Sequence, residues 1–185
     1  MTPLAELLDR NRERLDGRPS LLAGLTHADI TALRLRDVDC AAAHLVCRRW
    51  AEYVACSRAV DGWQFTSVAF GIDAAPDAAC GRALIALPQS RAAQAMVFHR
   101  ITSRLHPPQE LLVIGATRAG IRPAKNLLAT LFASVETVDH ARRHALLAAR
   151  DPRPTAALRA AASDWENLYE VAIGGTALTI CSLPG

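Results

Sequence analysis

The residues of this sequence best suited to chemistry lie in a loop between Gly115 and Gly120, which carries Arg118 and leads to Arg122. An apolar run that ends at Ile114 precedes the loop, and its pattern predicts a buried strand followed by a helix. In an open α/β sheet, ligands bind beyond the carboxyl ends of the strands, where this loop would lie. Backbone N–H groups at a helix start, together with two guanidinium groups, would suit a phosphate.

The loop matches no complete phosphate-binding motif. A dinucleotide fingerprint needs G-x-G-x-x-G and a P-loop needs G-x-x-x-x-G-K-[ST], whereas Ile121 and Arg122 follow Gly120 here. The partial match favours an alternative in which the glycines only permit a tight strand-to-helix turn. Pro123 marks the expected start of the helix, because proline is favoured at the first helical position.

A second polar cluster follows the strand that is expected at Val135–Val138. It consists of Asp139, His140, Arg142, Arg143 and His144. Because the cluster follows another strand-like run, we expect it to lie near the Gly115 loop, and the two together would form a shared anion-binding rim. The alternative, which the residue types slightly favour, is a solvated turn.

Catalytic and metal-binding patterns are absent from the sequence. The six histidines show no H-E-x-x-H or comparable spacing, so no metal site is expected. No G-x-S-x-G elbow supports a serine hydrolase. Cys40, Cys47 and Cys56 have no identifiable neighbouring base, and none of the five cysteines shows C-x-x-C spacing, which favours buried thiols. We therefore assign no catalytic, cofactor-binding or metal-ligating residue.

The composition indicates one domain with an aliphatic core. The chain has 185 residues, of which 51% are hydrophobic and only 5% aromatic. The net charge of +3 is compatible with nucleic-acid binding and with many proteins that bind none. Lys125 is the only lysine, and arginine suits bidentate phosphate contacts, although the alanine-rich composition favours coding bias as the cause. No apolar run is long enough for a signal peptide or a membrane span, so we expect a cytoplasmic protein without a membrane partner.

Strand-like and helix-like segments alternate over more than a hundred residues, which predicts βαβ units and an open, mostly parallel, twisted sheet with flanking helices. The expected helices cover Pro3–Leu15, His27–Leu35, Arg48–Arg58, Arg91–Leu105 and a segment from Pro123. The expected strands cover Ser20–Gly24, Cys40–Val46, Trp63–Phe70, Ala83–Leu87, a run from Leu111 and Val135–Val138. A C-terminal β-hairpin is expected from Trp165–Ile173 and Ala177–Cys181, joined by Gly174-Gly175.

Some side chains have expected places within these elements. Thr26 stands immediately before a helix and is predicted to cap it. Trp50 is expected to face inward, and it is interpreted, like Trp63 and Trp165, as a core or interface anchor rather than a base-stacking platform. His99 lies on a mainly apolar helix and is expected in the core or at its boundary.

Three segments resemble one known family. The phrase G-x-x-R-x-G-[IV]-[RK] occurs after a strand at Gly115–Arg122, V-D-x-A-R-R occurs at Val138–Arg143, and L-P-G stands at Leu183–Gly185. With the segment WENLYEVAIGGTALTICSLPG, they resemble the N-terminal domain of the bacterial ribosomal RNA small-subunit methyltransferase C family. The resemblance is closer in the second half of the chain, whereas the order of elements carries it in the first half.

The resemblance implies that residues 1–185 form a single N-terminal domain, with a degenerate class I methyltransferase-like (Rossmann-like) fold, and that the C-terminal catalytic domain is absent from this chain. Family members methylate the exocyclic amine of a guanine in 16S rRNA. Their C-terminal half binds S-adenosylmethionine and carries an N-P-P-[FY] tetrapeptide. That tetrapeptide does not occur here, and the connection that directly follows the first expected strand has a single glycine, Gly24. The resemblance thus implies that this chain is inactive on its own, binds no S-adenosylmethionine and supports its catalytic partner.

Three functions stay open from the sequence. The first is such a domain, which docks its own catalytic domain and contacts ribosomal RNA or the 30S subunit through Arg118, Arg122, Lys125, Arg142 and Arg143. The second is a free-standing α/β protein that binds a small anion or nucleotide at the Gly115–Gly120 loop. The third is a purely structural docking domain, marked by an exposed apolar patch that includes the Leu168–Cys181 hairpin.

Overall fold

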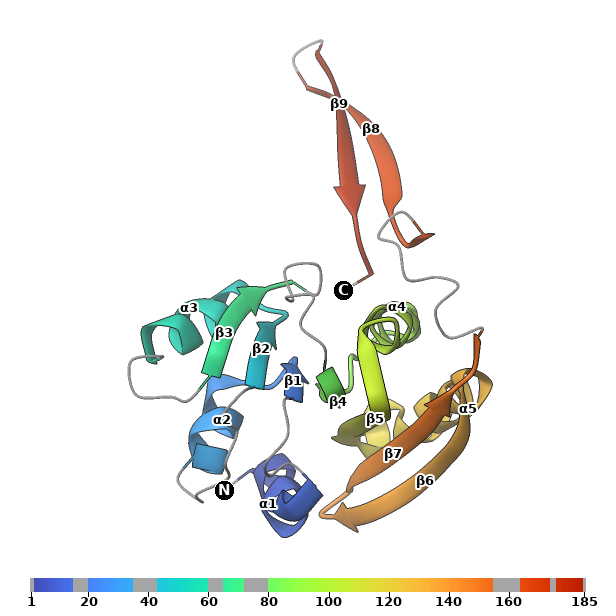
Figure 1. Cartoon of the computed structure of the whole chain (residues 1–185). Helices are drawn as coiled ribbons and strands as arrows, with labels where there is room; N and C mark the ends of the chain where they lie inside the picture. The colour runs from blue at the N-terminus through green and yellow to red at the C-terminus, as the bar shows by residue number, and fades with distance from the viewer. Residues whose placement is uncertain are drawn as a thin grey trace.

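The computed structural model describes residues 2–14, 20–34, 43–59, 65–71, 80–154, 164–173 and 176–184. Seven strands form one sheet in the order β3-β2-β1-β4-β5-β7-β6, and two more form a separate hairpin (Figure 1). Neighbouring strands from β3 to β5 are parallel, whereas β7 is antiparallel to both β5 and β6. The open, mostly parallel sheet predicted from the sequence is confirmed.

The strands of the sheet are β1 (Ser20–Ala23), β2 (Ala43–Cys47), β3 (Phe65–Phe70), β4 (Cys80–Ala86), β5 (Leu105–Ala116), β6 (Phe132–Ala141) and β7 (His144–Pro152). The helices are α1 (Pro3–Arg10), α2 (His27–Arg34), α3 (Trp50–Ala59), α4 (Arg91–Thr102) and α5 (Ile121–Leu131), with short 3-10 turns η1 (Arg12–Arg14) and η4 (Thr117–Ala119). The hairpin consists of β8 (Asn167–Ile173) and β9 (Thr176–Ser182), as expected, and the Gly174-Gly175 turn lies outside the described residues.

Helices cover both faces of the sheet, and successive strand residues alternate between them. Ile85 and Val113 pack in the core that includes α4 and α5, whereas Leu84 and Leu112 pack in the core that includes α1, α2 and α3. Because side chains alternate across a strand, a strand covered on both faces is apolar at most of its positions. This requirement explains the continuous apolar runs of the sequence.

Helix α5 begins at Ile121, so the expectation that Pro123 opens it is wrong by two residues. Gly120 precedes the helix with a φ of 92°, a left-handed conformation that glycine adopts without strain. Pro123 therefore stands at the third helical position. It is tolerated there because the first four N–H groups of a helix have no intrahelical acceptor.

Thr26 caps α2 as predicted. Its Oγ1 accepts from the N–H of Asp29 at 3.2 Å, and the Asp29 carboxylate accepts from the N–H of Thr26 at 3.1 Å.

Trp165 is 9% exposed and lies 5.7 Å from the half-buried His99 ring, which confirms both as core or boundary residues. Cys47 and Cys56 are buried free thiols, as expected.

The inward place expected for Trp50 is wrong, because 61% of this side chain is exposed. Trp50 is the first residue of α3 and lies at the carboxyl edge of the sheet, so little of the sheet lies beneath it. Trp63 lies outside the described residues.

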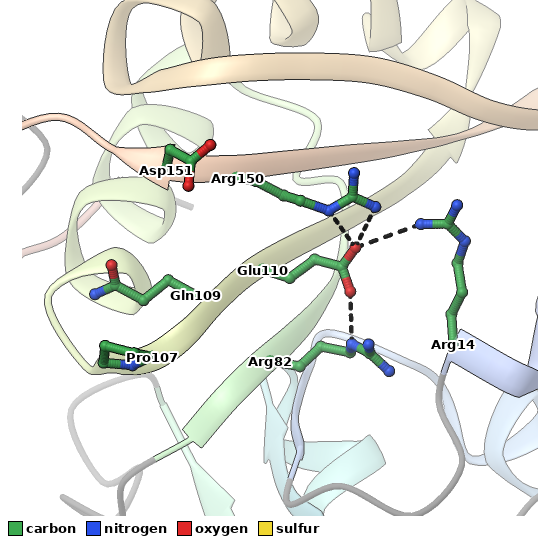
Figure 2. Close-up of a pocket in the computed structure, with 7 residues that line it drawn as sticks. All are labelled: Arg14, Arg82, Pro107, Gln109, Glu110, Arg150 and Asp151. Carbon is green, nitrogen blue, oxygen red and sulfur yellow. Dashed lines mark hydrogen bonds and ion pairs between the residues drawn. The ribbon is translucent and has the colours of Figure 1, made fainter.

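A buried carboxylate joins four elements at the amino edge of the sheet (Figure 2). Arg82 Nε on β4 donates to Glu110 Oε2 at 2.7 Å, and Arg150 on β7 donates to Glu110 Oε1 at 2.7 and 2.9 Å. Arg14 Nη1 of η1 donates to the same Oε1 at 3.4 Å. Register places Arg82, Glu110 and Arg150 side by side across three neighbouring strands, so the ladder itself aligns the charges.

The Glu110 cluster, formed by Glu110, Arg14, Arg82 and Arg150, favours the ionised carboxylate. Burial raises the pKa of Glu110, but hydrogen bonds and positive charge from Arg150 and Arg82 outweigh it, and the pKa lies below its ordinary value. Glu136 adds a second carboxylate 3.0 Å from Arg150 Nη1. The arginines of this edge are therefore largely neutralised within the protein.

We expect Glu110→Gln to lower the free energy of unfolding by about 3 kcal/mol at pH 7, because it leaves buried arginine charge without its counter-ion. Since the folded-state pKa lies below the unfolded one, the contribution of Glu110 is present above the unfolded pKa and is lost as pH falls through the folded pKa. Urea unfolding between pH 7 and pH 3 should therefore show the difference between wild type and variant shrinking with acid.

Glu136→Gln is the matched control, because Glu136 contacts Arg150 and Arg14 but its side chain is 48% exposed. We expect it to cost less than about 1 kcal/mol, as exposed ion pairs do. Equal losses in the two variants, or a Glu110→Gln loss that does not change with pH, would contradict the role assigned to Glu110.

Candidate functional site

The strand order reverses between β1 and β4, which makes the carboxyl edge beside these strands the expected ligand position of this architecture. Four connections meet at that edge, one after each of β1, β2, β4 and β5. Each leads into a helix, so α2, α3, α4 and α5 all begin there. The positive ends of four helix dipoles therefore lie along the carboxyl edge.

Gly24 and Arg48 follow β1 and β2, at the two positions where dinucleotide-binding sheets bind a nucleoside. Gly24 follows β1 with a φ of 73°, and its N–H donates to the carbonyl of Val46 at 2.9 Å. A Cβ on Gly24 would lie 2.3 Å from Nε of Arg48, so the guanidinium packs directly against this turn. Arg48 comes directly after β2, where a carboxylate holds the ribose hydroxyls in dinucleotide-binding sheets.

The carboxylates of these two connections are already engaged. Among the described residues between β1 and β3, the acidic side chains are Asp29 and Glu52. Asp29 accepts from Thr26, and Glu52 Oε2 accepts from the N–H of His27 at 2.7 Å. Both carboxylates therefore serve the first turn of α2, and Arg48 and Arg49 lie on the same edge, where burial of the guanidinium against Gly24 lowers the pKa of Arg48.

An open pocket of about 620 Å³ lies between the β4–α4 and β5–α5 connections. Two arginines line it, Arg91 from α4 and Arg118 from η4, together with Gln89 and Gly120. Gln94 is buried in its wall and donates from Nε2 to the carbonyl of Pro88 at 2.8 Å, which fixes the loop after β4. With two cationic side chains and no carboxylate in its lining, the pocket suits an anion.

The Gly115–Gly120 loop and the second polar cluster lie together, as expected. The N–H of Thr117 donates to the carbonyl of Arg143 at 2.7 Å, which joins the loop to the turn between β6 and β7. Arg142 and Arg143 form that turn with φ values of 44° and 66°, a conformation that favours glycine or asparagine. The turn holds two exposed arginines in strained backbone.

The polar cluster is not simply the solvated turn that the alternative described. Asp139 and His140 belong to β6, which extends to Ala141. The Asp139 carboxylate accepts from Arg10 at 2.6 Å and from Asn11 at 2.9 Å, so it fastens α1 to the sheet. Only Arg142 and Arg143 form the turn.

The five basic residues predicted from the sequence do not converge on one point. Arg118 lines the pocket, and Arg122 is exposed in the first turn of α5. Lys125 Nζ lies 3.2 Å from Thr137 Oγ1, and Arg142 Nε lies 3.2 Å from Glu6 Oε2. They form a cationic border along one side of the carboxyl edge.

Sequence reasoning missed Arg48, Arg49 and Arg91 at this edge. A usable signal was present, since each follows an apolar run closely, and residues after parallel strands gather at one edge. Within the described ranges, no three histidine, cysteine or acidic residues are grouped to hold a metal ion, and no helix of that part of the chain is long and apolar enough to cross a membrane.

The chain matches a family model described as "Methyltransferase small domain N-terminal" over residues 5–169. Among curated proteins, it is 32% identical over 109 residues to ribosomal RNA small subunit methyltransferase C of Pseudoalteromonas atlantica, an alignment that covers 59% of this chain and 31% of that protein. It is 28% identical over 186 residues to the protein of the same name from Salmonella choleraesuis, with 100% of this chain and 50% of that protein covered. The chain thus spans at most about half the length of these relatives.

Solved structures share the fold. A 16S rRNA N2 methyltransferase from T. thermophilus, in complex with AdoMet and guanosine, superposes with a TM-score of 0.70 at 18% identity, covering 100% of this chain and 47% of that chain. A methyltransferase from Pyrococcus furiosus gives a TM-score of 0.63 at 12% identity, covering 82% and 84%. The sheet is therefore of the Rossmann-like methyltransferase type.

The family model covers most of the chain, and its description agrees with the resemblance that the Gly115–Arg122 and Val138–Arg143 phrases carry. The similarity to ribosomal RNA small subunit methyltransferase C proteins points the same way. The chain therefore belongs to the methyltransferase small domain N-terminal family.

Proposed function

We propose that this chain is the non-catalytic N-terminal domain of an S-adenosylmethionine-dependent 16S rRNA (guanine-N2)-methyltransferase. In the cytoplasm it supports a C-terminal catalytic domain and contacts ribosomal RNA, free or in the 30S subunit. By itself it neither binds the methyl donor nor transfers a methyl group.

The observation that carries the proposal is the guanidinium of Arg48 packed against Gly24. A methyl donor in this fold needs a glycine turn that lets the backbone approach it and a carboxylate for its ribose hydroxyls. Here a cation follows β2, and it would repel the sulfonium charge of S-adenosylmethionine. The architecture of a methyltransferase is retained while the groups that would hold its donor are replaced.

The charge of the carboxyl edge supports an RNA contact. Arg91 and Arg118 line an open pocket, and Arg122, Arg142 and Arg143 extend the cationic border toward β6. Phosphate oxygens are bound by arginines and helix N-termini, and both are present here. The length of the curated relatives, about twice that of this chain, supports a partner domain in the complete protein.

Titration calorimetry of this chain with S-adenosylmethionine should show no saturable binding up to millimolar donor. The physical reason is the positive charge at Arg48 together with the missing glycine-rich turn. S-Adenosylhomocysteine, which lacks the sulfonium charge, serves as the second titrant and separates charge repulsion from a missing pocket. Micromolar affinity for either compound would contradict the proposal that the domain does not hold the donor.

Binding of a 16S rRNA fragment should weaken steeply with salt, because each arginine–phosphate contact releases a counter-ion. The double variant Arg118→Ala/Arg122→Ala should reduce the slope of log K against log salt by about 1.4, which is two contacts at roughly 0.7 each on a single strand. Fluorescence anisotropy at several salt concentrations measures both slopes.

The matched control removes two exposed arginines elsewhere, Arg12 of η1 and Arg58 in the last turn of α3. Arg12→Ala/Arg58→Ala has the same net charge as the test variant and should keep the wild-type slope within about 0.3, because neither residue meets a phosphate. Equal slopes for both double variants would show only a diffuse charge effect. A flat salt dependence of the wild type would remove the RNA contact altogether.

A second candidate function rests on the pocket itself, whose two arginines suit a small phosphorylated ligand. Calorimetry with inorganic phosphate and with guanosine monophosphate separates it from the first. Micromolar binding that both Arg91→Ala and Arg118→Ala abolish would favour a small-molecule site. Millimolar or absent binding favours RNA, because single phosphate contacts are weak until many act together.

A further inference from the structure

An exposed aromatic cluster lies at the carboxyl edge, on the far side of the sheet from the Arg118 pocket. We define the aromatic platform as Trp50, Tyr53 and Phe70. The Trp50 and Phe70 rings lie 5.3 Å apart at 86°, an edge-to-face pair, and Tyr53 lies 5.1 Å from Trp50 and 6.1 Å from Phe70. Trp50 is 61% exposed and Phe70 44% exposed.

The platform is rigidly supported. Trp50 begins α3 and Phe70 ends β3, so both rings stand on regular secondary structure. Tyr53 is half-buried and packs against the core that includes α1, α2 and α3, which anchors the other two rings from below. Aromatic pairs in this geometry hold each other in place, so little side-chain freedom would be lost when a flat ligand stacks on Trp50.

Positive charge lies directly beside the platform. Arg48 and Arg49 precede Trp50 in the chain, and both residues are exposed, with the Arg48 guanidinium packed against Gly24. The carbonyl of Arg49 accepts the N–H of Tyr53 at 3.0 Å, so these arginines stand at the positive end of the ten-residue helix α3. Glu52 is the acidic residue of this helix, and its carboxylate accepts a hydrogen bond from the N–H of His27.

The size of the platform decides between two classes of partner. Two fully exposed rings of this kind present roughly 150–250 Å² each, so the exposed fractions leave about 200 Å² in total. A stable protein interface buries about 800 Å² on each partner, roughly four times more. The platform therefore suits one or two nucleobases, and the adjoining arginines suit the phosphates between them.

We infer that the platform stacks an unpaired nucleobase of RNA while Arg48 and Arg49 contact the neighbouring phosphates. This inference rests on the RNA contact proposed above and adds a second contact area at the other end of the carboxyl edge. Stacking on aromatic rings is sequence-tolerant and contributes about 1–3 kcal/mol per base. It recognises single-stranded rather than duplex RNA, because the base face must be free.

The test uses the full chain and a fluorescein-labelled single-stranded oligoribonucleotide of about twelve uridines. This length lies within the range of about 4–16 nucleotides that single-strand binding sites cover. Trp50→Ala should weaken binding about 5- to 150-fold, the fold-change that corresponds to the stacking of one base. Trp50→Phe retains a ring and should remain within about threefold of wild type. Leu168→Ala removes another exposed apolar side chain, 65% exposed on β8, and should leave the affinity unchanged.

Two further readouts separate stacking from charge. The salt slope of Trp50→Ala should equal that of wild type, whereas Arg48→Ala/Arg49→Ala should lower it by about 1.4. An abasic oligomer with the same phosphates should bind wild type and Trp50→Ala equally. Circular dichroism and thermal unfolding confirm that each variant keeps the fold, and Trp50→Phe keeps the test valid should the alanine variant unfold.

Each outcome has one meaning for the inference. Wild-type binding with a steep salt slope and an unchanged affinity of Trp50→Ala overturns the platform and leaves the proposed RNA contact standing. Absence of RNA binding by the wild type overturns both. A wild type that binds the abasic oligomer as tightly as the uridine oligomer also overturns the platform, and the exposed rings would then be assigned to a protein contact.

Discussion

One carboxylate, that of Glu110, makes it possible for the central strands of this sheet to carry charged residues at their amino edge. Arg82, Glu110 and Arg150 are neighbours on β4, β5 and β7, and the buried Arg82 and Glu110 would each be costly alone. Shared hydrogen bonds remove that cost and also fasten η1 to the sheet through Arg14. The register of the central strands is thereby specified by charge as well as by apolar packing.

The two edges of the sheet differ in how their charges are paired. At the amino edge, Glu110 and Glu136 pair with Arg14, Arg82 and Arg150, so most of the positive charge there is compensated within the protein. At the carboxyl edge, Asp29 and Glu52 serve as caps for α2, the Arg48 guanidinium packs against Gly24, and Arg91 and Arg118 line an open pocket. Although the net charge is only +3, the uncompensated positive charge is therefore unevenly distributed over the molecule. Association with a polyanion depends on this local field more than on the total charge.

The sequence predicts the architecture well because its dominant signals are local. Apolar runs such as Leu111–Ile114 must be strands covered on both faces, and Thr26 with Asp29 is a local capping pattern. The proximity of the Gly115 loop to Arg143 followed from the rule that strand ends meet at one edge. The Glu110 cluster was beyond this reasoning, because Arg82 and Arg14 lie 28 and 96 residues away and no spacing links them. Trp50 was misplaced because helical periodicity does not show where the sheet beneath a helix ends.

The place of β7 has a consequence for the order of assembly. β6 pairs with β7 alone, and β7 is also the strand that joins it to β5. When a ribosome has released the chain as far as Ala141, the five parallel strands can already associate, but β6 has no strand to pair with. Because β6 and β7 are consecutive antiparallel strands joined by the Arg142-Arg143 turn, they can pair as a hairpin once the residues up to Pro152 have emerged, and β7 then pairs with β5. Until that point β6 is an unpaired strand that is exposed to wrong pairing.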